Sequence, residues 1–437
     1  MKSLIKLFRV ASTNLSLNNA KAAIMIKHLV TVLIFVITVG SINAQTDNKI
    51  VIGKIVQIPS KILGEKRTLW IYTPDMNSSF RDTSKHYPVI YLLDGDANFE
   101  SLVGVVRNLS QINGNSVFPE MIIVGILNTD RTRDLTPTHT SIDLPYFDSA
   151  SSVRTGGGGK FISFLEKELI PYIDSSYSTQ PYKMLIGHSL GGLMVMDILV
   201  NHPKLFNSYI CIDPSMWYDK EKFLRATEKK LSENKYRNTR LYLGIANTMP
   251  VGMTYQKMLK DTSSGTRHIR DIVAMDKYIK SNKNNGLVYA SKYYEVDNHT
   301  TVPLISQYDG LRFIFDYYDV KLQLQDFGDS TDLLAKKYQK TYETISNEFG
   351  YKLCPPERTI NAFGYLALSK KYYVSAASLF KLNIANYPNS HFAYASYGDY
   401  FVAIKDTSNA IVNYEKALTL TDNAVVRQKL TGLKAAK

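Results

Sequence analysis

Cysteine is scarce in this sequence. Only two cysteines, Cys211 and Cys354, occur among 437 residues, and this count excludes a scaffold held together by several disulfides. The two fall in different predicted domains, so either one interdomain bridge or two unpaired thiols would fit. The eight histidines show no spacing typical of metal ligands. The sequence therefore predicts no metal and no cofactor.

Blocks of like charge are also missing, although the formal net charge is +13 at pH 7. No nucleic-acid-binding motif accompanies the positive charge, which indicates a solvated surface with a mild attraction for anionic ligands or envelope surfaces. Apolar residues make up 45% of the chain and charged residues 21%, a composition typical of globular proteins. At this length we expect one large domain and one smaller domain.

The apolar stretch near the N-terminus, Leu29–Gly40, is short for a membrane span. It follows Lys27 and precedes small residues that end at Ala44, which is the order of a secretory signal. We therefore expect residues 1–44 to be an N-terminal extension and signal peptide cleaved after Ala44, with an uncleaved signal anchor as the alternative. Cleavage would lower the formal charge from +13 to +8. The mature protein would be periplasmic or secreted, with no stable membrane span.

Short runs rich in β-branched and aromatic residues predict strands. The first two runs are close enough to form a hairpin, and most later ones are separated by enough residues for a crossover helix. This alternation predicts an α/β fold, with a mostly parallel eight-stranded sheet and helices on both faces, over residues 45–325. The runs are Ile50–Ile58, Arg67–Tyr72, Val89–Leu93, Met121–Leu127, Lys183–Ile186, Tyr209–Ile212, Leu241–Ile245 and Val288–Val296.

Beyond residue 325 the pattern is helical, and residues of similar type recur 34 positions apart. This period resembles tetratricopeptide repeats, in which small residues let paired helices approach and aromatic residues fill the gap. We expect a small all-α domain over residues 326–437 with such repeats, docked on the helix 333–349 or on the large domain and able to hold a protein partner. A helical cap without repeats is the alternative. The matching pairs are Gly364 and Gly398, Leu368 and Val402, Ala376 and Ala410, and Phe380 and Tyr414.

The stretch Gly187-His188-Ser189-Leu190-Gly191 matches the pattern G-x-S-x-G. The pattern alone is weak evidence, but it follows a predicted strand and precedes an apolar run typical of a buried helix. A serine forced into such a turn projects its hydroxyl clear of the backbone, and the N-terminus of the next helix supports a developing oxyanion. These features predict that Ser189 is a nucleophile. A polar residue in a tight turn is the alternative.

A serine at neutral pH needs a general base. His299 is the only histidine after Ser189 that falls on a loop directly after a predicted strand, and the order serine then histidine is typical of α/β hydrolases. We therefore predict His299 as the general base. The other downstream histidines, His202, His268 and His391, fall at a helix end or in helical stretches and are not predicted to act.

The acid that should orient this base is harder to place. It is expected just past the seventh predicted strand, where the sequence has Asn247. An amide can orient an imidazole, but it cannot stabilise the imidazolium as a charge would. Either the site works as a dyad helped by Asn247, or an acid from the following segment folds back, with Asp261, Asp271 and Asp276 as candidates.

Two backbone amides are expected to form the oxyanion hole of such a site. One belongs to Leu190, which directly follows the nucleophile. The other belongs to Asp96, in the loop after the third predicted strand, and the side chain of Asp96 need not take part.

Several further motifs are spaced along residues 47–322. They are Tyr87-Pro88-Val89-Ile90-Tyr91-Leu92-Leu93-Asp94-Gly95, residues 128–138, Gly187 to Gly192, Pro214-Ser215-Met216-Trp217 and Asn298-His299. Together they resemble the Putative esterase family of α/β hydrolases, which includes enterobactin-type siderophore esterases, S-formylglutathione hydrolases, feruloyl esterases and mycolyltransferases. Members near the siderophore-esterase branch carry Gly-x-x-Glu after the seventh strand, and Gly244-Ile245-Ala246-Asn247 departs from that pattern at the acid.

Arg131 and Arg133 fall past the fourth predicted strand, on the same sheet edge as Ser189. With Trp217 nearby they would form a cationic, aromatic-lined mouth for an anionic or aromatic acyl substrate, such as a catecholate or ferulate ester. An internal ion pair of Arg133 with Asp134 is the alternative. The sequence thus favours a serine carboxylic-ester hydrolase that forms an acyl-enzyme on a small-molecule ester. There are two alternatives. One is an acyltransferase on the same site, and the other is a degenerate hydrolase that binds a ligand or protein through its repeats.

Overall fold

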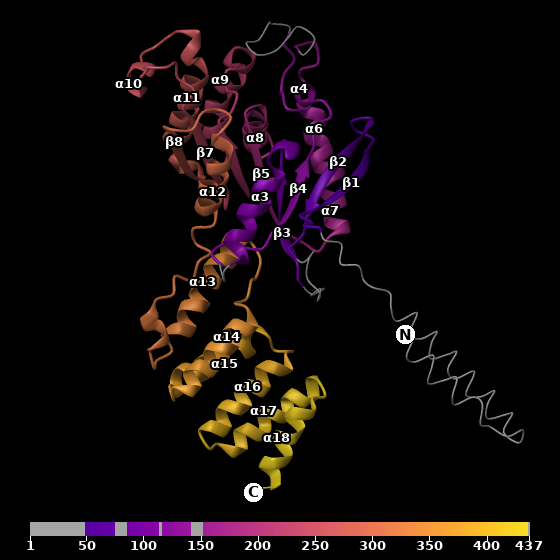
Figure 1. The fold of residues 1–437 in the computed structure, drawn as a ribbon, viewed down its shortest axis with the longest axis vertical. Coiled ribbons are helices and arrows are strands. Elements are labelled where there is room, and N and C mark those ends of the chain that lie inside the picture. Colours follow the sequence, from indigo (N-terminus) through magenta and orange to yellow (C-terminus); the bar gives the residue numbers. More distant parts are fainter. Residues whose placement is uncertain (1–48, 75–84, 113–115, 141–151, 436–437) are drawn as a thin grey trace, which may run out of the picture. The chain divides into compact units, whose positions relative to one another are not determined.

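Eight strands alternate with helices along the first three quarters of the chain (Figure 1). The computed structural model describes residues 49–74, 85–112, 116–140 and 152–435. The strands are β1 (Lys54–Ser60), β2 (Glu65–Tyr72), β3 (Tyr87–Leu92), β4 (Ile122–Ile126), β5 (Thr179–His188), β6 (Ser208–Ile212), β7 (Arg240–Ala246) and β8 (Val288–Tyr294). Each strand overlaps one of the predicted runs.

The strands form one sheet in the order β1-β2-β4-β3-β5-β6-β7-β8. β2 pairs antiparallel with both β1 and β4. All other neighbours are parallel, as their crossover helices require. The predicted class, an α/β fold with a mostly parallel sheet, is confirmed.

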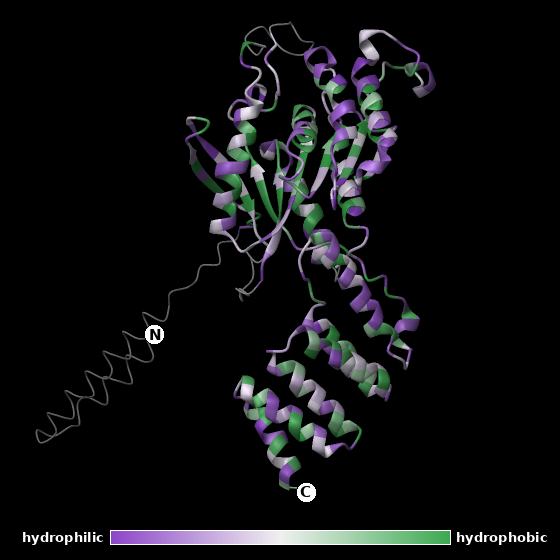
Figure 2. Ribbon diagram, turned by 180° about the vertical axis from the view of Figure 1, so that it is seen from behind, coloured by the Kyte–Doolittle hydropathy of each residue, from purple (hydrophilic) through white to green (hydrophobic). Residues whose placement is uncertain are grey.

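Strand side chains alternate between two apolar cores, because successive residues of a strand point to opposite faces of the sheet. In β3, Val89 and Tyr91 belong to one core, whereas Ile90 and Leu92 belong to the other. Figure 2 shows hydrophobic residues along these central strands. The first core packs under α6 (Gly158–Phe164), η3 (Leu165–Leu169), α7 (Ile170–Ser176), α8 (Leu190–Asn201), α9 (Tyr218–Glu233) and α11 (Arg267–Ser281), and the second under α3 (Gly95–Ser110) and α12 (Val302–Ile314).

The carboxyl ends of the parallel strands meet at one edge of the sheet, and the segments that follow them build the site described below. Short elements lie in these and other connections. They are α4 (Arg131–Asp134), α10 (Tyr255–Met258), η4 (Ser264–Thr266), η5 (Lys283–Asn285) and η6 (Leu324–Phe327).

Between η6 and residue 435, the last residue that the structure describes, all regular elements are helices. They are α13 (Leu333–Phe349), α14 (Glu357–Ser369), α15 (Tyr373–Asn386), α16 (His391–Ala403), α17 (Thr407–Leu420) and α18 (Ala424–Ala435). α14 packs on α15, and α16 packs on α17. A Cβ added to Gly364 would stand 2.6 Å from the ring of Phe380, and one added to Gly398 would stand 2.5 Å from the ring of Tyr414. The two helix pairs thus repeat the same close contact, while their assignment to tetratricopeptide repeats stays a prediction.

The C-terminal end of α13 packs into the same core as α3 and α12. Ile345 and Phe349 are buried there, and the ring of Phe349 stacks on that of Tyr182 with 4.6 Å between centroids. Arg240 at the start of β7 forms an ion pair of 3.4 Å with Glu348. Apolar and charged contacts therefore both join this helix to the sheet, and the predicted domain boundary at 325/326 stays a prediction.

The chain divides into two units, residues 1–51 and 52–437. The predicted signal peptide over residues 1–44 lies outside the described part of the chain. Within the described ranges, no helix combines the length and apolarity that a membrane crossing needs. Cys211 and Cys354 are both free thiols, so the two cysteines follow the unpaired alternative.

Candidate active site

Ser189 stands on a sharp turn between β5 and α8. Its backbone has φ 59° and ψ −115°, a conformation that non-glycine residues rarely adopt. The turn requires glycine at position 187, because a Cβ there would lie 2.4 Å from the carbonyl oxygen of Gly191. The amide of Ser189 donates to the carbonyl of Ile212 at 3.0 Å, which ties the turn to β6. Strain at this point is thus held by the neighbouring strand.

The imidazole of His299 faces this serine. His299 lies in the loop between β8 and α12, and its Nε2 is 3.1 Å from Ser189 Oγ. The hydroxyl of Ser215 lies 3.2 Å from the same oxygen. The structure therefore brings together the two residues that the sequence predicted as nucleophile and base, although they lie 110 positions apart.

The carboxylate that accepts from His299 is Asp213, which sequence reasoning missed. Its Oδ2 is 2.6 Å from His299 Nδ1, and its Oδ1 accepts from the backbone amide of Ala246 at 2.9 Å. Asp213 directly follows β6, the strand next to β5, and bends away with φ 40°. The position right after an apolar strand was the available signal, but we expected the acid one strand later.

Asp213 is fully buried and nevertheless ionised. Burial by itself would raise the pKa of this carboxyl group, but hydrogen bonds from His268 and His299 outweigh that effect and hold the pKa well below its usual range. A carboxylate in this state can orient an imidazole and stabilise the imidazolium that forms when the imidazole takes a proton.

The hydrogen bonds of Asn247 go to backbone groups and not to the imidazole of His299, which corrects the predicted dyad. Its side-chain amide donates to the carbonyl of Glu295 at 2.9 Å, and its Oδ1 accepts from the amide of Met249 at 3.3 Å. Its own amide donates to the carbonyl of Asp297 at 2.8 Å. Asn247 therefore ties the end of β7 to the loop that carries His299. The position beside the imidazole is taken by the carboxylate of Asp213, which follows β6.

The other candidate acids are held elsewhere. Asp261 accepts from the hydroxyls of Ser263 and Thr266, each at 2.5 Å. Asp276 binds Lys280 and the hydroxyl of Tyr289, each at 2.7 Å. The nearest cation to Asp271 is Arg267 at 3.9 Å. Local hydrogen bonds thus hold Asp261 and Asp276, and none of the three carboxylates forms a hydrogen bond with His299 in the described part of the structure.

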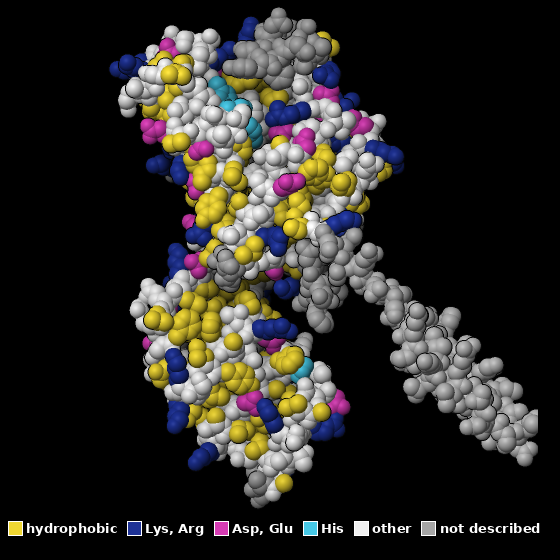
Figure 3. Space-filling view, in the orientation of Figure 1, with side chains coloured by type: hydrophobic (Ala, Val, Ile, Leu, Met, Phe, Trp, Pro, Cys, Tyr) yellow, Lys and Arg dark blue, Asp and Glu magenta, His cyan; other side chains and the backbone are white. Residues whose placement is uncertain are grey.

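Two further histidines surround the predicted base. The ring of His188 lies 4.5 Å from that of His299, and the ring of His268 lies 5.1 Å from it on another side. Burial, and then the proximity of His299, lower the pKa of His188 to about 4, so this imidazole is neutral at pH 7. His268 Nε2 is 2.9 Å from Asp213 Oδ2. Figure 3 shows histidine side chains gathered on this face of the molecule.

The predicted oxyanion donors differ in their surroundings. Leu190 begins α8 and lines the cavity beside Ser189, so its amide lies at the N-terminus of a long buried helix. Asp96 lies in the first turn of α3, and its carboxylate accepts from the side chain of Asn128 at 3.2 Å. Asp96 is not part of the cavity lining, and its role as an oxyanion donor stays a prediction.

A cavity of about 780 Å³ opens over the serine. Arg131 reaches it, but its guanidinium is held in a bidentate ion pair with Asp94, at 2.7 and 2.8 Å. Trp217, as expected, contributes to the wall. The lining includes Ser189, His299, His268, Trp217, Met249 and Arg131.

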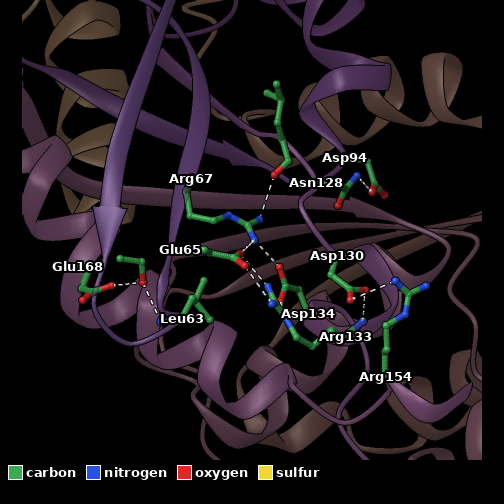
Figure 4. Close-up of polar contacts among 12 residues, drawn as sticks. Leu63, Glu65, Arg67, Asp94, Asn128, Asp130, Arg133, Asp134, Arg154 and Glu168 are labelled. Atoms are coloured by element: carbon green, nitrogen blue, oxygen red, sulfur yellow. Dashed lines mark hydrogen bonds and ion pairs between the residues drawn. The ribbon is translucent and has the colours of Figure 1, made fainter. Parts of the chain in front are cut away.

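Arg133 does not line the cavity, which corrects its predicted contact with substrate. It binds Asp134 at 2.7 Å and both carboxylate oxygens of Glu65, at 2.7 and 3.0 Å. Asp134 and Glu65 also bind Arg67, so α4 and β2 are joined by one partly buried ion-pair network (Figure 4). The structure contains the internal ion pair of Arg133 with Asp134, which was the alternative to substrate binding.

Asp213, His268 and His299 are the side chains here that could hold a metal ion. Their ligand atoms lie within 4.8 Å of one another. The same atoms already contact each other through hydrogen bonds, so protons account for the arrangement. The spacing of these residues along the chain could not have indicated the group.

A serine on a strained strand-to-helix turn, facing an imidazole after the last strand of a mostly parallel sheet, is the arrangement of the α/β hydrolases. The family model described as Putative esterase matches residues 60–271. The IroE-like serine hydrolase of Shewanella oneidensis is 30% identical, with a TM-score of 0.63 over 76% of this chain and 98% of that one. The chain therefore belongs to the Putative esterase family, and the predicted resemblance is confirmed.

Two other relatives extend the comparison. The ferri-bacillibactin esterase BesA of Bacillus subtilis is 32% identical over 169 residues, which span 37% of this chain and 58% of BesA, less than two thirds of its length. The structure of an uncharacterised protein from Capnocytophaga ochracea is 19% identical, with a TM-score of 0.59 over 87% of this chain and 99% of that one. The matched part of this chain is longer than residues 1–325, so this likeness in fold extends into the C-terminal helices.

Proposed function

We propose that this protein is a serine carboxylic-ester hydrolase that acts through an acyl-enzyme on Ser189. The observation that carries the proposal is the continuous path Ser189 Oγ to His299 Nε2, at 3.1 Å, and His299 Nδ1 to Asp213 Oδ2, at 2.6 Å. Family membership, the ferri-bacillibactin esterase BesA and the IroE-like serine hydrolase support it. An intact path of this kind argues against a degenerate hydrolase.

The acylation step follows from the geometry. Ser189 Oγ attacks the ester carbonyl while its proton moves to His299 Nε2, and Asp213 stabilises the resulting imidazolium. The amide of Leu190 and the N-terminus of α8 stabilise the oxyanion of the tetrahedral intermediate. When the intermediate collapses, the carbon–oxygen bond to the alcohol breaks and His299 returns the proton to the leaving oxygen.

Deacylation repeats these steps with water. His299, neutral again, takes a proton from a water molecule that attacks the acyl carbonyl, and Ser189 leaves with that proton. An acyltransferase would differ only in accepting an alcohol in place of water, and no feature of the described cavity favours an alcohol.

For the substrate we propose an ester of siderophore or aromatic-acid type. The relatives named above are a ferri-bacillibactin esterase and an IroE-like serine hydrolase. Trp217 and Met249 offer an aromatic and an apolar wall to an acyl group beside Ser189. The predicted signal peptide further leads us to propose a periplasmic or secreted location, where such esters would be encountered.

For the C-terminal helices we propose tetratricopeptide-like packing with a surface for a protein partner. The 34-residue relation between the Gly364–Phe380 and Gly398–Tyr414 contacts supports this proposal. Solution structures or binding data for residues 326–437 in the full chain would test it.

The esterase proposal is tested with a chromogenic short-chain ester and three proteins: the wild type, Ser189→Ala and Ser163→Ala. Ser163 is a half-buried serine of α6 that does not line the cavity, and it serves as the matched control. We expect Ser189→Ala to lose at least about 10³-fold in kcat/KM, with the control unchanged. Equal rates in wild type and Ser189→Ala would exclude the proposal.

The substrate class is tested by product analysis. A ferri-siderophore ester, the same siderophore without iron, and a feruloyl sugar are incubated side by side with the wild type and with Ser189→Ala. We expect a higher kcat/KM for the siderophore esters than for the feruloyl sugar. A preference for the feruloyl sugar would leave the esterase proposal standing and would favour the aromatic-acid type of substrate over the siderophore type.

A further inference from the structure

Two imidazoles converge on one oxygen of the buried carboxylate. Asp213 Oδ2 lies 2.6 Å from His299 Nδ1 and 2.9 Å from His268 Nε2, while Oδ1 is occupied by the amide of Ala246. An ionised carboxylate only accepts hydrogen bonds, so both imidazole nitrogens carry hydrogen. His268, in the first turn of α11, is thus as directly bonded to Asp213 as the predicted base is.

This arrangement decides the tautomers of both rings. With hydrogen on Nδ1, neutral His299 has its lone pair on Nε2, which faces Ser189 Oγ. With hydrogen on Nε2, neutral His268 has its lone pair on Nδ1. His268 lies at the wall of the cavity and 18% of its side chain is exposed, so solvent can reach it while Asp213 stays fully buried.

One negative charge serves both rings. The ring centroids of His268 and His299 are 5.1 Å apart, so positive charge on both at once is disfavoured. A carboxylate that already accepts a second hydrogen bond on the same oxygen also stabilises the His299 imidazolium less than an undivided one would. His268 therefore opposes the protonation of His299.

Other charged and titratable groups face this pair from the surrounding elements. From the end of β5 comes His188, whose charge state is also affected by Arg131 and Asp94. From α11 and α9 come groups that interact with Asp271, which itself lies one turn along from His268. These are Arg267, Arg270 and Glu221. In the described part of the structure none of these side chains forms a hydrogen bond with Asp213 or with either ring, which sets His268 apart.

We propose that His268 is a positioning residue of the esterase reaction, which shares Asp213 with His299 and so keeps His299 a neutral base down to a lower pH. The proposal rests on the proposed function. His268 touches no reacting atom, and it acts through the carboxylate: it holds Oδ2 in line with His299 Nδ1 and limits how strongly the imidazolium is stabilised.

The test is the pH profile of kcat/KM for a chromogenic ester between pH 4 and 10, with EDTA present throughout. Four proteins are compared: the wild type, His268→Leu, His268→Gln and His202→Gln. Leucine removes the hydrogen bond, glutamine keeps an N–H donor, and His202 is an exposed histidine at the end of α8 that serves as the control.

We expect the acid half-point of the His268→Leu profile to move up by about half a pH unit to one unit. The plateau should fall by less than about tenfold, because nucleophile, base and acid all remain. His268→Gln should lie close to the wild type, and His202→Gln should match it. An unmoved half-point in His268→Leu, or an equal loss of rate at every pH, would overturn the proposal.

A second measurement keeps the proposal testable if His268→Leu does not fold. Imidazole 1H–15N spectra of the wild type, assigned with His268→Gln, report the tautomer of His268. We expect hydrogen on Nε2, and hydrogen on Nδ1 alone would overturn the proposal. The esterase proposal is tested separately, by the activity of Ser189→Ala. Failure of this inference and failure of the esterase proposal can therefore be told apart.

Discussion

The residues that do chemistry here are placed by the ends of parallel strands. Ser189 follows β5, Asp213 follows β6 and His299 follows β8, so three distant positions meet at one sheet edge. The serine and the histidine were predictable, because one stands in a glycine-rich turn and the other directly after a strong strand. The acid was not, since strand order alone does not say which neighbouring strand supplies it.

Substitutions of Asp213 and of Asn247 should show which of the two residues supports His299. We expect Asp213→Asn to lower kcat/KM by more than about 10³-fold, because the amide cannot stabilise the His299 imidazolium. Asn247→Ala should cost less than about tenfold, since the hydrogen bonds of the Asn247 side chain go to backbone groups of Glu295 and Met249. Steady-state kinetics with the same ester measure both. A larger loss in Asn247→Ala than in Asp213→Asn would return the acid position to β7.

Asp271 is a residue whose charge disfavours the folded state. Burial, and then the nearby Glu221, raise its pKa to about 6, and its Oδ2 is buried without a hydrogen bond. The folded protein therefore binds this proton more tightly than the unfolded chain does, so the stabilisation is present at low pH and is lost as pH rises from about 4 through about 6.

Removing that charge should stabilise the protein at neutral pH. We expect Asp271→Asn to raise the free energy of unfolding at pH 7 by about 1 kcal/mol, a value discounted for partial solvent screening. The gain should vanish near pH 4, where the wild-type carboxyl group is protonated. Urea unfolding at both pH values measures it, with the exposed Glu228→Gln on α9 as the control. A gain that persists undiminished at pH 4 would contradict this account.

At the level of elements, close helix contacts shape the C-terminal region. Gly364 in α14 lies against the ring of Phe380 in α15, and Gly398 in α16 lies against the ring of Tyr414 in α17. The sequence indicated these pairs, because a small residue and an aromatic residue recur 34 positions apart. It did not indicate that α13 would contact the sheet through its last turn.

A methyl group placed in this contact should be destabilising. We expect Gly364→Ala to lower the free energy of unfolding by about 1–3 kcal/mol, because the new Cβ would lie 2.6 Å from the Phe380 ring and the helices would have to move apart. Gly432→Ala in α18 is the matched control, since nothing lies within 4 Å of its added Cβ. That variant should gain about 0.5–1 kcal/mol from helix propensity.

Thermal unfolding followed by circular dichroism compares the two variants. If both variants were more stable than the wild type, the space between Gly364 and the Phe380 ring would be larger than the structure shows.

Across the whole molecule, one helix links the sheet to the C-terminal helices. Phe349 of α13 contributes its ring to the core formed by α3, α12 and the sheet, and it contacts Tyr182 and Phe315. Arg240 adds its ion pair with Glu348. The same helix contributes Leu334 and Tyr338, from its first turns, to a separate core with the helices that follow.

Truncating this shared side chain should therefore destabilise the sheet itself. We expect Phe349→Ala to lower the free energy of unfolding by about 3 kcal/mol, since the ring is 4% exposed and leaves a cavity against Tyr182. Phe392→Ala should change it by less than about 0.5 kcal/mol, because that ring is 60% exposed.

Denaturant unfolding monitored together with esterase activity measures this effect. If Phe349→Ala and the wild type lost esterase activity at the same denaturant concentration, the packing of Phe349 would not contribute to the stability of the hydrolase part.

The sequence by itself determined the eight strands, the strand-to-helix turn at Ser189, the imidazole of His299 and the small-to-aromatic repeat beyond residue 325. Each of these depends on local patterns, such as alternation, glycine spacing and periodicity. Only the tertiary structure decided that Asp213 is the acid, that His268 shares it, that Arg133 faces Glu65 and that α13 packs on the sheet. These contacts join residues far apart in the chain, and the order of strands and the packing of helices, rather than any short pattern, bring them together.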